Sequence, residues 1–298
     1  MFYRVLLSVL IVGVFLTSRA AAFQFLEPWG YVWMNSGQYK TNLEDNKFNS
    51  NITRVEGKAG IDLLPLWNKA TLQPYFAYYS VGSGDLHSWN NNTITGGGVQ
   101  VSPFMGMTEL DWLQDTKIFY ETLSIRWSVK EDDDWTDEPG YNYTTDTRTG
   151  FDLWHTWNVP AQYAVENREL LWGELWTDLS FRDTNFGSTW ESDFKTYMFS
   201  FQPKVGIYLF KLFNNLSLEP YFTANCITSG KEYSYQNNIA YGAGIRVRPL
   251  SSGYILGLDL RIFKRLVFYA ETLAVSYLKD RGDVDHDLRF GVDFNIGR

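Results

Sequence analysis

Polar and apolar residues alternate with a period of two over much of the chain. In residues 52–64 the apolar side chains of Val55 and Ile61 share one parity, and charged side chains occupy the other. The last segment, 287–296, alternates in the same way. Successive side chains of a β-strand point to opposite faces, so this period predicts strands with one apolar and one charged face. A charged face this regular does not fit a soluble core, and it fits the watery interior of a barrel with a lipid-facing exterior.

The chain contains one stretch twice. Residues 58–76 and 204–222 align without a gap at an offset of 146, and both run from Lys-x-Gly-Ile to Leu-x-Pro-Tyr-Phe. Further matches follow in the same order along both halves. A repeat of this length indicates the architecture of the whole chain. We therefore predict an internal duplication, with repeats at about 28–159 and 171–298.

Loop lengths set the expected number of strands. Long polar connections alternate with short ones, as in outer-membrane barrels, where both termini lie on the same side. We predict an all-β fold, a transmembrane antiparallel up-and-down β-barrel of about 12 strands, with 14 and 16 left open. Residues 254–262 alternate well enough to form a further strand. Their counterpart, 108–113, is predicted to be a short helix, with Thr108 and Asp111 placed as a capping box.

Composition fits an exported barrel. Aromatic residues make up 17% of the chain although the mean hydropathy is −0.26. A soluble β-sandwich with carbohydrate-binding aromatics is the competing interpretation. Cys226 is the only cysteine, so the chain has no internal disulfide. The formal charge is −8 without a basic stripe, which argues against nucleic acid as a partner.

The first residues predict export. Residues 1–22 contain a basic Arg4, an apolar run at 5–16 and an Ala-Ala-Ala cleavage site at 20–22. These are the parts of a cleaved secretory signal peptide. The mature chain, 23–298, is then predicted to be a single barrel domain in the outer membrane of a Gram-negative bacterium, in contact with membrane lipid and lipopolysaccharide.

No motif predicts an enzyme. Residues 155–157, His-Thr-Trp, lack the serine of the His-x-Ser pair to which they are similar in outer-membrane phospholipases. Residues 283–285, Asp-Val-Asp, and 85–87, Asp-Leu-His, resemble the paired acids of omptin proteases, but in the reverse order along the chain. A hydrolase of either kind is a remote alternative, because such chemistry needs its groups within hydrogen-bond reach.

Metal and cofactor sites are not predicted either. The three histidines, His87, His155 and His286, are scattered and form no ligand motif. The acidic run at 131–134 has oxygen ligands suited to Ca²⁺, which bridges lipopolysaccharide, but a solvated loop is the favoured interpretation.

The predicted interior is the candidate functional site. By parity the following charged residues face the lumen: Arg54, Glu56, Lys58, Asp62, Arg126, Arg148, Asp152, Glu174, Asp178, Arg182, Lys204, Glu219, Arg246, Arg248, Arg289 and Asp293. Both signs are present, so two interpretations stay open. The first is a porin-like channel for small hydrophilic solutes such as saccharides. The second is a plugged barrel, whose charges pair with each other and which acts as a structural or surface-interaction protein through its outer loops. Glu121 and Glu271 fall on the apolar parity, so we expect them at the lipid interface.

Two resemblances concern the C-terminal part. The alternating segment 287–296 is similar to the C-terminal assembly signal of bacterial outer-membrane barrels, which implies the barrel-assembly machinery as a partner, although Gly297 and Arg298 extend past it. Residues 242–250 with the closing strand resemble the C-terminal barrels of exopolysaccharide exporters and phage-adsorption proteins over about the last 60 residues. This second resemblance implies polysaccharide passage. Those families carry tetratricopeptide repeats before the barrel, and this chain has none.

Overall fold

The computed structural model describes most of the chain from residue 27 onward. The described residues are 27–41, 48–66, 70–84, 91–105, 112–127, 144–157, 171–184, 194–212, 216–230, 237–249, 254–255, 258–259, 265–278 and 284–296. The predicted signal peptide, the acidic run at 131–134 and the Asp-Leu-His stretch at 85–87 lie outside them.

Twelve long strands of the described residues build the fold. They are β1 (Glu27–Thr41), β2 (Phe48–Asp62), β4 (Thr71–Ser83), β5 (Asn92–Val101), β6 (Thr116–Trp127), β7 (Thr144–Trp157), β8 (Leu171–Thr184), β9 (Phe194–Ile207), β11 (Leu216–Ser229), β12 (Asn238–Arg248), β15 (Val267–Tyr277) and β16 (Val284–Ile296). Strands of 10–15 residues are long enough to cross a bilayer when tilted.

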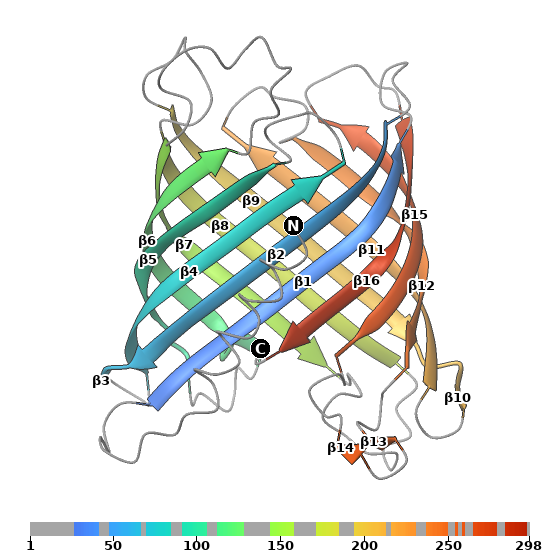
Figure 1. Ribbon diagram of the computed structural model, residues 1–298, viewed down its shortest axis with the longest axis horizontal. Coiled ribbons are helices and arrows are strands. Elements are labelled where there is room, and N and C mark those ends of the chain that lie inside the picture. Colours follow the sequence, from blue (N-terminus) through green and yellow to red (C-terminus); the bar gives the residue numbers. More distant parts are fainter. Residues whose placement is uncertain are drawn as a thin grey trace.

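The strands close into a barrel (Figure 1). Each long strand pairs antiparallel with the next in chain order, and β16 returns to pair with β1 through ten residue pairs. Closure leaves no open edge whose N–H and C=O groups would face lipid unpaired. The prediction of an antiparallel, up-and-down barrel of twelve strands is confirmed, and the alternatives of 14 and 16 strands are wrong.

Four short strands lie at one end of the barrel. β3 (Leu64–Pro65) and β10 (Phe210–Leu212) extend the pairing of β4 and β11. β13 (Tyr254–Ile255) and β14 (Leu258–Asp259) pair only with each other, beside the barrel end (Figure 1). The described parts of the alternating stretch 254–262, residues 254–255 and 258–259, are therefore not part of a barrel strand. Of its predicted helical counterpart, residues 112–113 form a 3₁₀ turn, while Thr108 and Asp111 lie outside the described residues.

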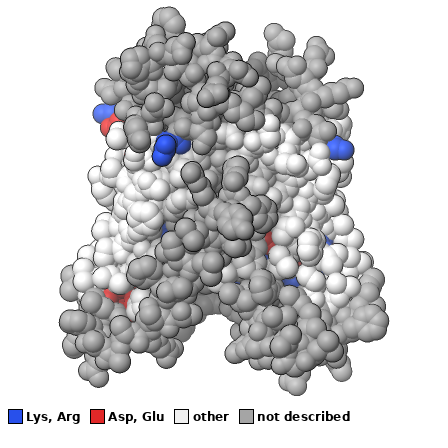
Figure 2. All heavy atoms as spheres, in the orientation of Figure 1, with Lys and Arg blue, Asp and Glu red and all other residues white. Residues whose placement is uncertain are grey.

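The outer wall is largely apolar. Its large side chains are exposed, with Phe222 at 74%, Phe181 at 62% and Phe76 at 54%. Figure 2 shows a wall of mostly uncharged residues, with few charged atoms and several of these near the upper rim. Exposed apolar side chains on this scale need an apolar solvent such as lipid. Among the described residues, no helix is long and apolar enough to cross a membrane.

Two glycines let tyrosine rings lie flat against the inner wall. A Cβ placed on Gly98 would stand 2.8 Å from Cζ of Tyr75, and one on Gly244 would stand 2.6 Å from Cζ of Tyr221. Both distances are shorter than any ordinary contact, so only glycine fits there. The two tyrosines are repeat equivalents, and both belong to the clusters described next.

Candidate functional site

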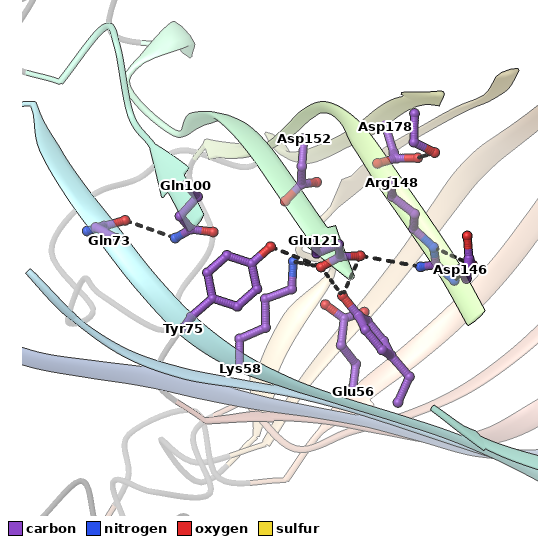
Figure 3. A network of polar contacts seen from close by, with 12 residues as sticks. Glu56, Lys58, Gln73, Tyr75, Gln100, Glu121, Asp146, Arg148, Asp152 and Asp178 are labelled. Carbon is purple, nitrogen blue, oxygen red and sulfur yellow. Dashed lines mark hydrogen bonds and ion pairs between the residues drawn. The ribbon is translucent and has the colours of Figure 1, made fainter. Parts of the chain in front are cut away.

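A buried carboxylate lies at the centre of the polar cluster in the first half, which we name the Glu121 cluster (Figure 3). The hydroxyl of Tyr75 on β4 donates to Glu121 on β6 at 2.9 Å. Lys58 Nζ on β2 lies 3.7 Å away, and Arg148 Nη1 on β7 lies 3.5 Å from the other oxygen. Arg148 also pairs with Asp146 at 2.7 Å. Four strands thus meet on one carboxylate that is 1% exposed.

The second half contains the same arrangement, which we name the Glu271 cluster. Tyr221 on β11 donates to Glu271 on β15 at 2.8 Å. Arg289 Nη1 on β16 lies 3.6 Å from Glu271 and its Nη2 lies 2.6 Å from Asp287. The repeat aligns each of these residues with a member of the Glu121 cluster. The tyrosine, arginine and aspartate of each cluster therefore make the same contacts in both halves, whereas the Lys58 contact is described for Glu121 alone.

A tryptophan packs on the tyrosine of each cluster. The Trp29 and Tyr75 ring centroids are 6.0 Å apart with a 56° interplanar angle. For Trp172 and Tyr221 the values are 5.9 Å and 55°. Tilted aromatic pairs at this separation stabilise a core beyond the area they bury. The rings hold each tyrosine hydroxyl toward its glutamate.

The prediction that Glu121 and Glu271 lie at the lipid interface is wrong. Both are buried inside the barrel, at 1% and 8% exposure. The parity of Glu121 on β6 also carries Leu123 and Ile125, each 1% exposed. The sequence prediction assigns the apolar face of each strand to lipid, but part of this barrel's interior is itself an apolar core. Leu123 packs there with Tyr75 and Ala77.

The second half also holds an ion cluster, formed by Glu174, Glu219, Arg246 and Arg248. Glu219 on β11 is fully buried and accepts from Arg246 Nε at 2.5 Å and from Arg248 Nε at 3.3 Å. Arg246 Nη1 reaches Glu174 on β8 at 2.7 Å, across two intervening strands. The guanidinium of Arg246 lies 3.4 Å from the ring centroid of Trp172. Charge-assisted bonds and stacking together hold Arg246 in place.

The repeat-equivalent positions of the first half form an amide cluster, which consists of Asp62, Gln73 and Gln100. Gln100 Nε2 donates to Gln73 Oε1 at 2.9 Å, and Gln73 Nε2 donates to Asp62 at 2.6 Å. Figure 3 shows the two glutamines facing each other from neighbouring strands. Gln73 is the equivalent of Glu219, and Gln100 is the equivalent of Arg246. The same place in the fold thus carries two amides in one half, where the other half carries a carboxylate and a guanidinium.

The junctions between the halves also match. Trp33 Nε1 on β1 donates to Asp293 on β16 at 3.1 Å. Trp176 Nε1 on β8 donates to Asp152 on β7 at 3.0 Å. Each bond joins the last strand of one repeat to the first strand of the other, so the halves are linked in the same way on both sides of the barrel.

The remaining predicted residues that face inward line the wall between these clusters. Arg54 stacks over Tyr39 at 5.8 Å, and Glu56 accepts a hydrogen bond from Tyr31. Lys204 lies 5.9 Å from the ring of Tyr221. Asp178 and Arg182 are joined through Ser180, at 3.2 Å and 3.1 Å.

Arg126 differs from the other predicted lumen residues in its placement. It is exposed, and it shares its parity on β6 with the outward Ile118 and Tyr120, which are 52% and 50% exposed. Besides Glu121, parity reasoning missed the inward charged residue Lys117 on β6, which lies 6.0 Å from the ring of Trp29. The wrong placement of Arg126 and the omission of Lys117 have the same cause: the parity that points inward on β6 is apolar, so parity reasoning assigns it to lipid.

Asp146 and Asp287 are absent from the predicted lumen residues, although a signal for them exists. Each precedes its arginine by two positions, in Asp-x-Arg at 146–148 and at 287–289. In the structure, the spacing of two places both side chains on the inner face, where each aspartate accepts from its arginine. Within the described residues, no group of three or more His, Cys, Asp or Glu is arranged to hold a metal ion.

Comparisons with known proteins support no family. No family model matches the chain, and no curated protein matches it. Among solved structures, the β domain of the Bordetella autotransporter BrkA is 10% identical, with a TM-score of 0.35 over 90% of this chain and 98% of that one. The NanC porin is 8% identical, with a TM-score of 0.37 over 88% and 98%. A bacterial polysaccharide outer membrane secretin is 12% identical, with a TM-score of 0.35 over 91% and 98%.

These TM-scores are too low to assign a class by similarity, so the class of the protein rests on its own geometry. The strands close without an edge, the outer wall is apolar, and the inner wall carries buried charged clusters. These features together define an outer-membrane β-barrel.

Proposed function

We propose that this protein is a narrow outer-membrane channel for small hydrophilic solutes. The supporting observation is that charged side chains of the inner wall keep contact with water inside a barrel whose outer wall is apolar. The Glu174 side chain is 22% exposed and the Arg289 side chain is 21% exposed, although both make ion pairs. A purely structural core would seal such groups, whereas a conduit leaves them wetted.

The inner wall favours solutes with many hydroxyl groups over ions of one sign. Acidic and basic residues alternate around it, and indoles of Trp33 and Trp176 lie beside the carboxylates of Asp293 and Asp152. An aromatic face beside a carboxylate offers an apolar surface and a hydrogen-bond acceptor together, which suits the two faces of a saccharide. Saccharides are therefore the proposed solute class.

Planar bilayers test the channel. The purified mature protein is expected to give discrete conductance steps, and Arg289→Gln is expected to change their size because it removes a wetted charge from the lumen. Arg126→Gln is the matched control, since that arginine lies on the outer wall. Folded protein that gives silent bilayers would overturn the channel.

The buried clusters favour one second candidate, a plugged barrel. Glu219 and Arg248 have side chains that are 0% and 3% exposed, so this part of the interior is filled by paired charges. Such a barrel would act through its outer loops, as a structural or surface-interaction protein. Deleting the segment 128–143 should then abolish partner binding, such as phage adsorption, and leave permeability unchanged. An equal loss of permeability would exclude this candidate.

The proposal also covers the cellular location of the protein, its insertion into the membrane and its origin by internal duplication. Export by residues 1–22, insertion by the barrel-assembly machinery, and residence in an outer membrane with lipopolysaccharide are all part of it. The matching Glu121 and Glu271 clusters support origin by duplication. No enzymatic activity is proposed. Membrane fractionation and heat-modifiable gel migration test the proposed location. A soluble protein that migrates alike before and after boiling would contradict it.

A further inference from the structure

The apolar outer wall is interrupted on one side, near the ends of β6, β7, β8 and β9 that lead to the connections 128–143 and 185–193. One row of paired residues across these four strands carries Thr122, Thr147, Asp183 and Lys195. Ser124, Arg126 and Thr145 continue this surface toward the ends of the strands. These seven residues form what we name the polar outer face. Lys195 and Asp183 have side chains that are 74% and 55% exposed.

The adjacent row fixes the level of this surface in the membrane. It pairs Tyr120, Thr149, Phe181 and Tyr197 across the same strands. Its three aromatic residues are exposed by 50%, 62% and 42%. Exposed aromatic side chains form girdles at the membrane interface of such barrels. The polar outer face begins one row beyond this girdle, which is the level of lipid headgroups.

The equivalent positions in the second half are different. The row through Thr272 and Leu288 is the repeat counterpart of the row through Thr122 and Thr147. There Leu288 is 44% exposed, and Phe290, the counterpart of Thr149, is 41% exposed. Ala274 replaces Ser124. Thr272 and Lys40, the counterparts of Thr122 and Asp183, remain polar and exposed, so the second half keeps a shorter polar row that Leu288 interrupts.

The surface is also hollowed. An open hollow of about 460 Å³ is lined by Thr147, Thr149, Asp183, Lys195 and Tyr197, among other residues. Lys195 Nζ lies 3.4 Å from Asp183, and an ammonium has three donors, so this pair leaves donors directed to the surroundings. The hollow therefore offers a cation, hydroxyl groups and an aromatic edge to a molecule at the headgroup level.

We propose that the polar outer face binds the phosphorylated sugar headgroup of a glycolipid in the outer leaflet. Arg126 and Lys195 would bind its phosphates, because charge-assisted bonds to phosphate are the strong contacts available to them. The threonines would bind its sugar hydroxyls, and Tyr120, Phe181 and Tyr197 would contact its acyl chains. Arg126 and Lys195 are three strands apart and four residues apart along the strand direction, about 20 Å at ordinary strand dimensions, so the ligand must be wide and carry more than one phosphate. This site is separate from the lumen; it rests on the proposed residence in an outer membrane with lipopolysaccharide and not on the channel.

The test uses the full mature protein folded in phosphatidylcholine vesicles, with purified lipopolysaccharide as the probe. The midpoint temperature of the heat-modifiable gel shift is measured with and without it. The wild-type protein and Lys40→Gln should show the same rise, and Arg126→Gln with Lys195→Gln should lose at least half of it. Lys40 is the matched control, because it is an exposed lysine in the equivalent row of the second half, beside Leu288 and away from the polar outer face. An undiminished rise in the double variant would overturn the proposal.

Three further arms separate the sources of phosphate. Dephosphorylated lipopolysaccharide should give less than half of the wild-type rise, and inorganic phosphate should give none. Vesicles of phosphatidylglycerol that reproduce the full rise would overturn a glycolipid site in favour of general anionic lipid. If the double variant does not fold, Lys195→Gln alone is measured and should still lose part of the rise; a full rise there would count against the site. Unchanged conductance in these variants separates the outcome from that of the channel.

Discussion

The amide cluster and the ion cluster occupy equivalent places in the two halves of one barrel. Gln73 and Gln100 are held by an amide–amide hydrogen bond and by one bond from Gln73 to the Asp62 carboxylate, whereas Glu219 and Arg246 form a direct ion pair. Around both places the scaffold is the same, with a tryptophan, a tyrosine and a glycine making matched contacts. The fold therefore tolerates either chemistry, and the difference between them is not imposed by strand pairing.

This comparison separates the clusters that stabilise the barrel in both halves from the cluster that is found in one half. The Glu121 and Glu271 clusters are alike in both halves and join strands that are not neighbours. The ion cluster exists in one half and fills the lumen there with paired charges. A buried ion pair is costly to break but adds little over a well-satisfied neutral pair. We expect a single substitution in the ion cluster to lower the free energy of unfolding strongly, and a substitution of both members of an ion pair to lower it only a little.

The largest expected effect comes from Glu219→Gln. It leaves Arg246 and Arg248 buried without their carboxylate, and breaking a buried pair costs about 3–5 kcal/mol. The urea midpoint of the folded form in vesicles should fall accordingly. Gln73→Met at the equivalent position removes an amide–amide bond and one bond to the Asp62 carboxylate but breaks no ion pair, so it should cost about 1–3 kcal/mol. Equal losses in the two variants would show that the clusters do not differ in energy.

A smaller effect is expected at the shared clusters. Glu121→Gln should lower the free energy of unfolding by about 3 kcal/mol and Glu271→Gln by about 2 kcal/mol, because hydrogen bonds to a buried charge are worth about 1.5–3 kcal/mol each. The excess at Glu121 is attributed to Lys58, which lies 3.7 Å away. Adding Lys58→Met to both variants should remove the difference. A larger loss at Glu271 would contradict this account.

Substitution of the two glycines that face a tyrosine ring should lower the free energy of unfolding by about 2 kcal/mol. Gly98→Ala and Gly244→Ala each place a Cβ within 2.8 Å of a tyrosine ring, and overpacking costs about 1–3 kcal/mol. Gly57→Ala is the matched control, since its nearest neighbour would be 3.5 Å away. Thermal unfolding of the three variants measures the comparison. A control that is as destabilised as the others would remove the steric explanation.

The smallest net effect is expected from a paired change. Glu219→Gln with Arg246→Gln converts the centre of the ion cluster into the glutamine pair found in the first half. Because the removed charges compensate each other, the double variant should lie within about 1–2 kcal/mol of wild type. A double-mutant cycle in urea measures the recovery. If the two losses simply add, the clusters are not interchangeable and the comparison fails.

Much of the barrel was predictable from period and repeat. Alternation predicted strands, and the lengths of the loops in the two repeats predicted twelve of them, which the structure contains. The interior was harder to predict, because parity identifies two faces but does not say which of them points inward. Charged residues settled this on β2, where Glu56 and Lys58 face inward. On β6 the same argument failed, since Leu123 and Ile125 are core residues.

By itself, the sequence determined a closed barrel with charged inner positions and two equivalent halves. The tertiary structure alone decided which carboxylates became centres of buried clusters. Glu121 receives Tyr75 and Lys58 from strands two and three places away, and Arg246 reaches Glu174 in the same manner. Contacts between strands that are not neighbours depend on curvature and tilt of the closed wall. No local pattern records these quantities, because each strand carries only its own alternation.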